Sequence, residues 1–546
     1  MRTSGVLMHI SSLPSPYGIG TMGKAAYEFV DFLKEAGQTY WQILPLGQTG
    51  FGDSPYQSCS TYAGNPYFID LDMLVEEGYL AKEDLDAITW CEREDRIDFG
   101  GLYSKRYPVL RKAFEVFKEN LPADYDPFCW EQGEWLENYA LFMAIKNDKN
   151  GASWDVWEPD LKAREPEAIA AAKKKLGMEM FFWKMLQYFF FRQWKALKAY
   201  ANEKGIKIIG DLPIYVARDS VDVWSNAQLF DLDEDCNPKE VAGCPPDAFS
   251  EDGQLWGNPL YRWGEMRKDG YRWWMNRLRH MYGFYDVVRI DHFRGFESYF
   301  CIPAGDETAK NGYWRKGPGL EFFDTMKFAL GDVQVFAEDL GYLTPGVRKM
   351  LRGSGYPGMK VLQFAFDDNH DNEYLPHNYI RNCVAYTGTH DNDTNVGWLR
   401  SLSKEKHARV ADYLHLDKKE GMSWGMMRAI WASSADTAIV TMQDLLGLPG
   451  TARMNMPSTS GINWLWRAKP GYLKKGLAEK IYACCMKYSR LGYSEDSSWL
   501  NAEDDTTPIG EKLPVKKKEE TVIAEAASDS VVKETAEEEI AEAEEA

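Results

Sequence analysis

Short runs of apolar, β-forming residues recur through most of the chain, and each run predicts a buried strand. The segments between them carry apolar residues at helical spacing, as in Gly23–Ala36, an amphipathic helix that Gly37 ends. Strands that alternate with helices are typical of a parallel sheet, either a barrel or a doubly wound sheet. Eight strands are predicted, at Ser4–Ile10, Tyr40–Leu46, Ile206–Asp211, Val287–Ile290, Val333–Glu338, Met359–Phe364, Cys383–Thr389 and Ala438–Asp444.

The alternation of strands and helices is interrupted twice. Between about residues 71 and 180, charged helix-favouring segments such as Ser104–Glu119 alternate with tryptophan-rich loops. A structureless connection of this length is uncommon inside a compact domain, so we predict a largely helical inserted subdomain. A second insertion, at about residues 212–284, contains a long loop, Gly243–Tyr261, and a helix, Trp263–Tyr282.

Charged side chains gather where three of the predicted strands end. Arg289 and Asp291 lie two residues apart, so they point to the same side of their strand. The cation would keep the carboxylate ionised, as a nucleophile requires, although a structural ion pair explains this stretch equally well. Glu338 ends a second strand, and His390 with Asp391 ends a third. Catalytic groups from several strands meet at the C-terminal rim of a (β/α)8 barrel, and paired carboxylates are what glycoside chemistry requires.

Composition and charge exclude several classes of function. The net charge of −20 argues against nucleic acid or an anionic membrane as a partner. Aromatic residues make up 14% of the chain, which suits stacking on sugar rings, although core packing accounts for most of them. Nine scattered cysteines without a CxxC pair, and an N-terminus without a signal sequence, predict a cytoplasmic protein with free thiols.

The C-terminal segment differs sharply from the rest in composition. From Asn501 onward it carries 15 acidic and 5 basic residues, a net charge of −10, and no aromatic residue follows Trp499. Such a segment cannot bury a core. We therefore predict a catalytic barrel over residues 1–499 and a disordered acidic tail over residues 500–546.

A series of short motifs is more specific than the strand pattern. The motifs are Leu44–Gly47, Ser54–Tyr56, Ala63–Pro66, Gly210–Tyr215, Gly253–Tyr261, Arg289–Arg294, Ala337–Gly341, Gly358–Phe364 and Thr387–Asp391. With them the chain resembles, from Ser4 to about Ser489, the 4-α-glucanotransferases of glycoside hydrolase family 77, also called amylomaltases or disproportionating enzymes, in the α-amylase clan. The resemblance implies a (β/α)8 TIM barrel that moves α-1,4-glucan segments between maltooligosaccharides, with glucose as a possible acceptor.

The resemblance also implies roles for individual residues. Asp291 is the implied nucleophile, Glu338 the general acid/base, and Asp391 the carboxylate that grips the sugar at the bond being broken. Other residues are implied or suggested to bind substrate, with Asp247 and Phe249 in a loop that resembles a lid: Arg289, His390, Asp211, Tyr56, Asp247, Phe249, Trp256, Asn258, Phe364 and Asn463. No cofactor and no metal is expected, because the sequence lacks a phosphate loop, a nicotinamide fingerprint and a metal-ligand cluster.

Two other functions remain open at this point. A retaining α-glucan hydrolase would use the same three carboxylates, and the outcome depends on whether water or a sugar hydroxyl reaches the intermediate. The Gly243–Tyr261 loop is the feature that favours transfer. A catalytically dead glucan-binding or scaffold protein is the second alternative, and the intact Asp291, Glu338 and Asp391 argue against it.

Overall fold

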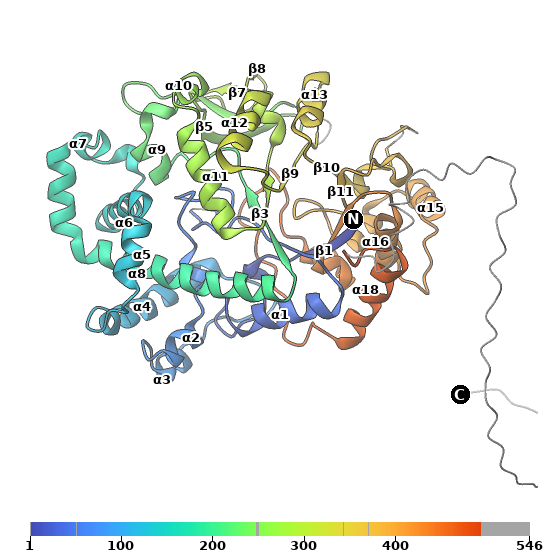
Figure 1. Cartoon of the computed structure of the whole chain (residues 1–546), viewed down its shortest axis with the longest axis horizontal. Helices are drawn as coiled ribbons and strands as arrows, with labels where there is room; N and C mark the ends of the chain where they lie inside the picture. Colours follow the sequence, from blue (N-terminus) through green and yellow to red (C-terminus); the bar gives the residue numbers. More distant parts are fainter. Residues whose placement is uncertain are drawn as a thin grey trace, which may run out of the picture. The chain divides into compact units, whose positions relative to one another are not determined.

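Eight parallel strands form a closed barrel at the centre of the molecule, in the order β1-β12-β11-β10-β9-β6-β3-β2 (Figure 1). The computed structural model describes residues 2–50, 52–246, 250–341, 343–367, 369 and 371–492. All eight predicted strands are strands of this barrel, so the (β/α)8 prediction is confirmed. Their bounds are β1 Thr3–Leu7, β2 Tyr40–Gln42, β3 Lys207–Leu212, β6 Val287–Ile290, β9 Val335–Ala337, β10 Gly358–Val361, β11 Cys383–Tyr386 and β12 Thr437–Thr441.

The barrel closes where β1 pairs with both β12 and β2. Gly5 makes this closure possible, because a Cβ atom at this position would lie 2.6 Å from the Cβ atom of Tyr40. Apolar side chains from the strands fill the interior, so the barrel is a packed core and not a channel. They include Leu7, Ile209, Val287, Phe336, Met359, Val361, Val384, Tyr386 and Ile439.

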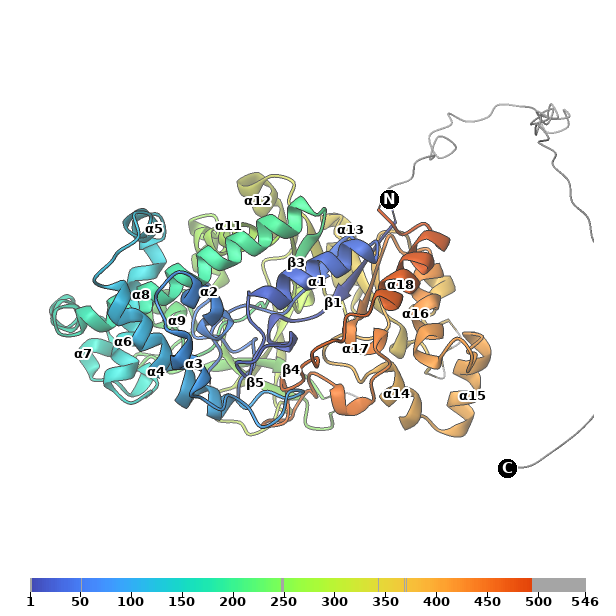
Figure 2. The ribbon, with the colours of Figure 1, turned by 90° about the horizontal axis from the view of Figure 1, so that it is seen from below.

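Helices surround the barrel and are packed through a second, larger apolar core. Figure 2 shows α1 (Lys24–Glu35) beside the C-terminal helix α18 (Lys475–Lys487), and these two helices are in contact. The predicted helix Trp263–Tyr282 is two helices, α10 (Trp263–Lys268) and α11 (Arg272–Phe284). The break occurs because Gly270 and Tyr271 both adopt positive φ, at 69° and 56°. Helix α12 (Leu320–Leu330) precedes β9. The other helices after β9 are α13 Pro345–Ser354, α14 Asn395–Ser401, α15 Lys404–Tyr413, α16 Met422–Ala432 and α17 Met442–Leu445.

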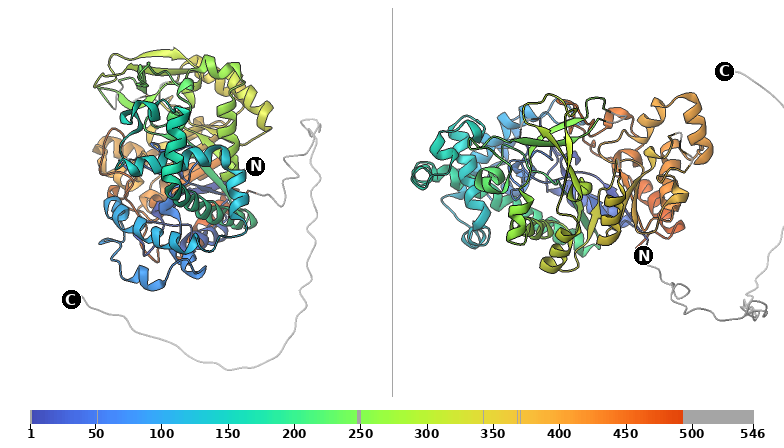
Figure 3. Two further views of the ribbon diagram at one scale, coloured as in Figure 1. Left: turned by 90° about the vertical axis from the view of Figure 1, so that its left-hand side faces the viewer. Right: turned by 90° about the horizontal axis from the view of Figure 1, so that it is seen from above.

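The segment between β2 and β3 is largely helical, as predicted from the interrupted alternation of strands and helices there. Figure 3 shows its helices, coloured blue to cyan, gathered on one side of the barrel. The longest of them, α8 (Pro166–Glu203), also packs against α1 and so belongs to both the insertion and the barrel wall. The others are α2 Leu71–Glu76, α3 Lys82–Asp86, α4 Phe99–Phe117, α5 Tyr125–Glu131, α6 Gly133–Asp148 and α7 Pro159–Lys162, with the short α9 (Val221–Ser225) after β3.

A small antiparallel sheet, which the sequence analysis missed, stands above the rim of the barrel toward the top of Figure 1. Its order is β5-β4-β7-β8. The prediction that Gly243–Tyr261 is a loop throughout is wrong at both ends, because Gly243 and Cys244 belong to β4 and Gln254–Pro259 form β5. The first of these strands pairs with β5 and also with β7, far along the chain. Such long-range pairing overrides weak local propensity. The strands are β4 Glu240–Cys244, β5 Gln254–Pro259, β7 Ser298–Pro303 and β8 Tyr313–Lys316.

Two other predictions are limited by the part of the chain that the structure describes. Residues Met1–Ser494 form one compact unit. The predicted boundary at residue 499 and the predicted tail at 500–546 lie outside the described residues. Among the helices that are described, none combines the length and the apolar character needed to cross a membrane.

Candidate active site

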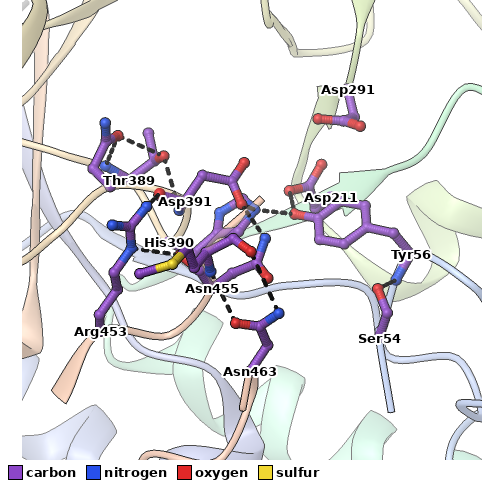
Figure 4. Close-up of polar contacts among 12 residues, drawn as sticks. Ser54, Tyr56, Asp211, Asp291, Thr389, His390, Asp391, Arg453, Asn455 and Asn463 are labelled. Carbon is purple, nitrogen blue, oxygen red and sulfur yellow. Dashed lines mark hydrogen bonds and ion pairs between the residues drawn. The ribbon is translucent and has the colours of Figure 1, made fainter. Parts of the chain in front are cut away.

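The three carboxylates that the sequence singled out all lie at the C-terminal rim of the barrel. Asp291 directly follows β6, Glu338 directly follows β9, and Asp391 lies on the loop that follows β11. Figure 4 shows Asp291 and Asp391 close to Asp211, which is itself part of β3. Side chains from four strands or strand ends therefore meet in one place, as expected for a TIM-barrel site.

Arg289 is the central cation of this group. Its Nη1 donates to both carboxylate oxygens of Asp211, at 2.7 Å each, and to Oδ1 of Asp291 at 2.8 Å. The side chains of Arg289 and Asp211 are 4% and 0% exposed, whereas that of Asp291 is 28% exposed. The predicted same-side placement of Arg289 and Asp291 is thus correct. Asp211 occupies the closed end of the triad, and Asp291 faces outward where a ligand can reach it.

The ionisation of the two rim carboxyls follows from burial and from their charged neighbours. Burial raises the pKa of Asp291, the Arg289 guanidinium opposes this shift, and the negative charge of Asp211 adds to it. Burial raises the pKa of Glu338 as well, and there the charge of Asp291 adds to the shift. For Asp291, the sequence analysis considered only the neighbouring cation and not the burial that raises the pKa. Of the two carboxyls, Asp291 has the Arg289 guanidinium as its direct hydrogen-bond partner, which favours its ionised form over that of Glu338.

Main-chain groups hold the Glu338 carboxyl in place. Its Oε2 accepts from the main-chain N–H of His292 at 2.7 Å, and its Oε1 accepts from that of Leu340 at 2.9 Å. His292 has φ 51°, in the left-handed region that few residues with a side chain adopt. Two further main-chain bonds, Glu338 N to Ile290 O and Phe293 N to Glu338 O, join the ends of β6 and β9. This backbone fixes the nucleophile candidate and the acid candidate relative to each other.

His292 is neutral and is not placed as a metal ligand. Burial lowers the pKa of His292 to about 3, and the nearby Arg294 adds to the shift. Its ring meets the Trp256 ring edge-on, with centroids 4.9 Å apart. Within the described residues, no group of three or more His, Cys, Asp or Glu side chains is arranged to hold a metal ion.

Tyr56 links the Asp211 end of the site to the Asp391 end. Its hydroxyl lies 2.8 Å from Oδ2 of Asp211 and 2.8 Å from Nε2 of His390 (Figure 4). The hydroxyl has one proton, so if it donates to Asp211 it accepts from the Nε2–H of His390. Burial lowers the pKa of His390, which keeps the ring neutral in that tautomer. The same Nε2 lies 3.5 Å from Oδ1 of Asp391.

Two residues of the loop after β12 contact Asp391, and the sequence analysis did not assign them. Asn455 donates from Nδ2 to Oδ1 of Asp391 at 2.6 Å, and its main-chain N–H donates to the His390 carbonyl at 3.0 Å. Arg453 donates to the main-chain carbonyl of Asp391. The only sequence signal for them was their place in the loop after the last barrel strand, because a single asparagine in a loop has no periodicity to reveal its role.

The remaining predicted binding residues fall into two groups. Trp256 on β5 and Phe364 after β10 are half-buried aromatic side chains at the rim, with the Phe364 ring edge-on to Tyr374. Asn258 and Asn463 are buried. Asp247 and Phe249, the predicted lid residues, lie outside the described residues.

The polar atoms of the two asparagines are occupied by neighbouring loops. Asn258 donates to the Val216 carbonyl at 2.7 Å and also pairs with the Gln57 side chain. Asn463 accepts from the main-chain N–H of Met456 at 2.9 Å and donates to the Thr459 carbonyl at 2.9 Å. In this structure both residues therefore shape the loops that border the site.

Comparison with known proteins agrees with this geometry. A family model described as 4-alpha-glucanotransferase matches residues 8–474. A 4-alpha-glucanotransferase from Clostridium butyricum is 51% identical over 485 residues, covering 88% of this chain and 100% of that protein. A 4-alpha-glucanotransferase from Thermus thermophilus is 46% identical over 501 residues, covering 90% of this chain and 99% of that protein.

Solved structures give the same result. An amylomaltase from Streptococcus agalactiae, in complex with acarbose, is 44% identical with a TM-score of 0.88, covering 90% of this chain and 100% of that chain. An amylomaltase from Corynebacterium glutamicum, 20% identical with a TM-score of 0.71, has the same fold over 90% of this chain and 75% of its own. Together with the family match, these likenesses show that the chain belongs to the 4-alpha-glucanotransferase family.

Proposed function

We propose that this 4-alpha-glucanotransferase moves α-1,4-glucan segments by a retaining double displacement in which Asp291 is the nucleophile. The observation that carries the proposal is the Arg289 hydrogen bond to Asp291, made from a guanidinium that is itself fixed by the buried Asp211. This arrangement supports an ionised, oriented carboxylate whose second oxygen is available for attack. A neighbouring protonated Glu338 is the matching general acid.

In the first step, Asp291 attacks the anomeric carbon while Glu338 gives its proton to the leaving glycosidic oxygen. The donor's reducing-end fragment departs, and the retained segment is bound covalently to Asp291. In the second step, the ionised Glu338 takes the proton of an acceptor 4-hydroxyl, which displaces Asp291 and reforms an α-1,4 bond. We expect the two carboxyls to lie about 5–5.5 Å apart for this chemistry.

The other residues of the site have proposed binding roles. Asp391 would hold hydroxyl groups of the sugar at the bond being broken, because its carboxylate is part-exposed and is oriented by Asn455. His390, with its ring held by Tyr56, would donate or accept at the same sugar. Trp256 and Phe364 would provide stacking surfaces for neighbouring glucose units, since sugar rings pack well on aromatic faces.

Transfer to a sugar is preferred over hydrolysis only if the site positions an acceptor. Holding the acceptor in attacking geometry can offset about 7–11 kcal/mol of barrier, which is enough to overcome the concentration of water. Exposed apolar side chains could cover such an acceptor; they are Leu255 on β5 and Met456 and Ile462 in the segment after α17. The relatives named 4-alpha-glucanotransferase favour transfer over hydrolysis.

Glucose is the smallest acceptor that we propose. The cytoplasm is the proposed location, because the adjacent Cys484 and Cys485 are free thiols.

The products formed from pure maltotriose test this proposal. We expect glucose together with a ladder of longer maltooligosaccharides, while the concentration of reducing ends stays nearly constant. The Asp291→Asn variant is the control and should form neither. Reducing ends that rise steadily, with no product longer than maltotriose, would identify a hydrolase instead.

A further inference from the structure

A second cavity lies among the helices that follow β11, on segments that contribute nothing to the site described above. It has a volume of about 710 Å³ and is lined by α14, the start of α15 and the start of α16. Ligand pockets of this size are ordinary for small organic molecules, and they combine an apolar lining with a few convergent polar groups. The cavity is therefore large enough for a molecule with a body and a charged group.

The charged groups of the lining are both cations. They are Arg400 at the end of α14 and Lys404 on α15, and the side chain of His407 on α15 also lines the cavity. In the part of the chain that the structure describes, none of the three forms an ion pair, although the whole chain has a net charge of −20. The carboxylate of Glu420, just before the cavity residue Gly421, is already held by Arg428 at 2.9 and 3.0 Å. The cavity thus presents unneutralised positive charge on an acidic protein.

The N-terminus of α16 adds to the positive potential. This helix begins after Gly421, which has φ 97° and supplies no side-chain cap. Gly421, Met422 and Ser423 line the cavity, so the N–H groups of the uncapped first turn lie at its wall. The first N–H groups of a helix have no partner within it and carry partial positive charge. They complement the positive charges of Arg400 and Lys404.

The rest of the lining is apolar. It includes Leu399 and Leu402 on the α14–α15 side, with Met422 and Trp424 on α16. Lys480 of α18 lies over the Trp424 ring, 3.6 Å from its centroid, so one face of the indole is covered by a cation. A ligand that bound here through charge alone would leave this apolar surface unused.

We propose that this cavity binds a small phosphate monoester, with the phosphate beside Arg400, Lys404 and the α16 N-terminus and the ring of its organic part against Trp424. A phosphate monoester carries nearly two negative charges at neutral pH and three strong acceptor oxygens. Arginine and lysine bind such a group by charge-assisted hydrogen bonds, and a helix N-terminus also favours it. Sugar phosphates and nucleoside monophosphates share this chemistry.

The site is separate from the catalytic rim but connected to it through α14. This helix begins at Asn395, four residues after Asp391, and its far end carries Arg400. Seven helical residues span roughly 10 Å. The N-terminal end of α14 is also fixed to α17, the short helix directly after β12, because the Asn395 N–H donates to Asp444 at 2.7 Å. The cavity residues are not among the residues proposed to bind the glucan. Substitutions in the cavity can therefore test ligand binding there without changing the glucan site.

Isothermal titration of the full-length protein tests the proposal with four probes: glucose 1-phosphate, adenosine monophosphate, inorganic phosphate and glucose. At least one of the two monoesters should bind saturably and more tightly than inorganic phosphate. The monoester that binds more tightly would show whether the organic part of the ligand is a sugar or a nucleoside. Glucose at the same concentration should not bind at the cavity. Absence of saturable binding by both monoesters, or equal binding of inorganic phosphate, would overturn the proposal.

A double variant then locates the binding. Arg400→Gln with Lys404→Gln should weaken monoester binding at least tenfold while leaving the melting temperature and the maltotriose reaction unchanged. Lys406→Gln is the matched control, because Lys406 is on the same helix and exposed but does not line the cavity. Monoester binding that survives the double variant, or that is lost equally in Lys406→Gln, would show that the ligand binds elsewhere.

Discussion

Asn455 donates a hydrogen bond of 2.6 Å from its side-chain amide to Oδ1 of Asp391. The two residues are 64 positions apart and lie on the loops after β12 and β11. Because the same asparagine also binds the His390 carbonyl through its main chain, it fixes both the direction of the carboxylate and the loop that carries it. Its role is one of positioning, since it acts on the sugar only through Asp391.

The first prediction concerns this hydrogen bond. Asn455→Ala removes a hydrogen bond to a charged group, of about 1.5–3 kcal/mol, so kcat/KM on maltotriose should fall by about tenfold to hundredfold. Asn455→Asp should be worse than Asn455→Ala, because it places a second negative charge against Asp391. Equal activity of the two variants, at unchanged melting temperature, would mean that the amide does not orient the carboxylate.

The second prediction concerns the three carboxylates. Asp291→Asn, Glu338→Gln and Asp391→Asn should each lower turnover by several orders of magnitude without unfolding the protein. Each substitution keeps the shape of the side chain but removes a charge or a proton that the transition state uses. The measurement is the rate of reaction on maltotriose, with circular dichroism as the check on folding. Near-normal turnover by any one folded variant would refute the role assigned to that residue.

The third prediction concerns pH. The reaction needs an ionised Asp291 and a protonated Glu338, and the pKa of each is raised. Activity should therefore fall on the acid side as Asp291 takes up a proton and on the alkaline side as Glu338 loses its proton, with both limbs above the ordinary carboxyl range. Asp211→Asn removes a charge that raises the pKa of Asp291, so the acid limb of kcat/KM should move to lower pH. An acid limb that stays in place or moves upward contradicts the proposed arrangement around Arg289.

The fourth prediction concerns the closure of the barrel. Gly5→Ala would place a Cβ atom 2.6 Å from the Tyr40 Cβ and 2.7 Å from its carbonyl oxygen, so the strands must move apart. Overpacking of this kind costs about 1–3 kcal/mol of the free energy of unfolding. Gly476→Ala in α18 is the control, because nothing lies within 4 Å of the added atom. Denaturant unfolding of both variants measures the difference, and equal stability would argue against tight packing at Gly5.

The fifth prediction comes from composition. Truncation after Pro514 removes a strongly charged segment without an aromatic residue. The melting temperature and the specific activity on maltotriose should not change, because such a segment contributes little to a core. A fall of several degrees in the melting temperature would show that this segment is bound to the folded part.

The barrel could be predicted from the sequence because its strands are buried on both faces. Such strands appear as continuous apolar runs, as in Val335–Ala337 and Cys383–Tyr386, and these runs are easily recognised. The small sheet could not be predicted in the same way. Its strands are partly exposed, contain Gly and Pro, and are held together by the pairing of β4 with β7.

The site was predictable where its residues end strands and unpredictable where they lie in loops. Asp291 and Glu338 directly follow apolar runs, so their position on the rim follows from the fold. Asn455 reaches Asp391 only through the path of the loop after β12, and no local pattern encodes that path. The raised pKa of Asp291 could be found only from the structure, because it depends on burial and on Asp211, which binds the same guanidinium.

The sharing of one guanidinium has a consequence for what the site attracts. With Glu338 protonated, the carboxylates of Asp211 and Asp291 share the one positive charge of Arg289, and Asp391 adds a further carboxylate near them. The excess is negative, and it surrounds the position where a glycosyl ring becomes an oxocarbenium-like cation. The negative potential that stabilises this transient positive charge also favours ligands that are already cationic when they bind. Ring-shaped amines of glucose size should thus be inhibitors whose affinity weakens as their nitrogen loses its proton.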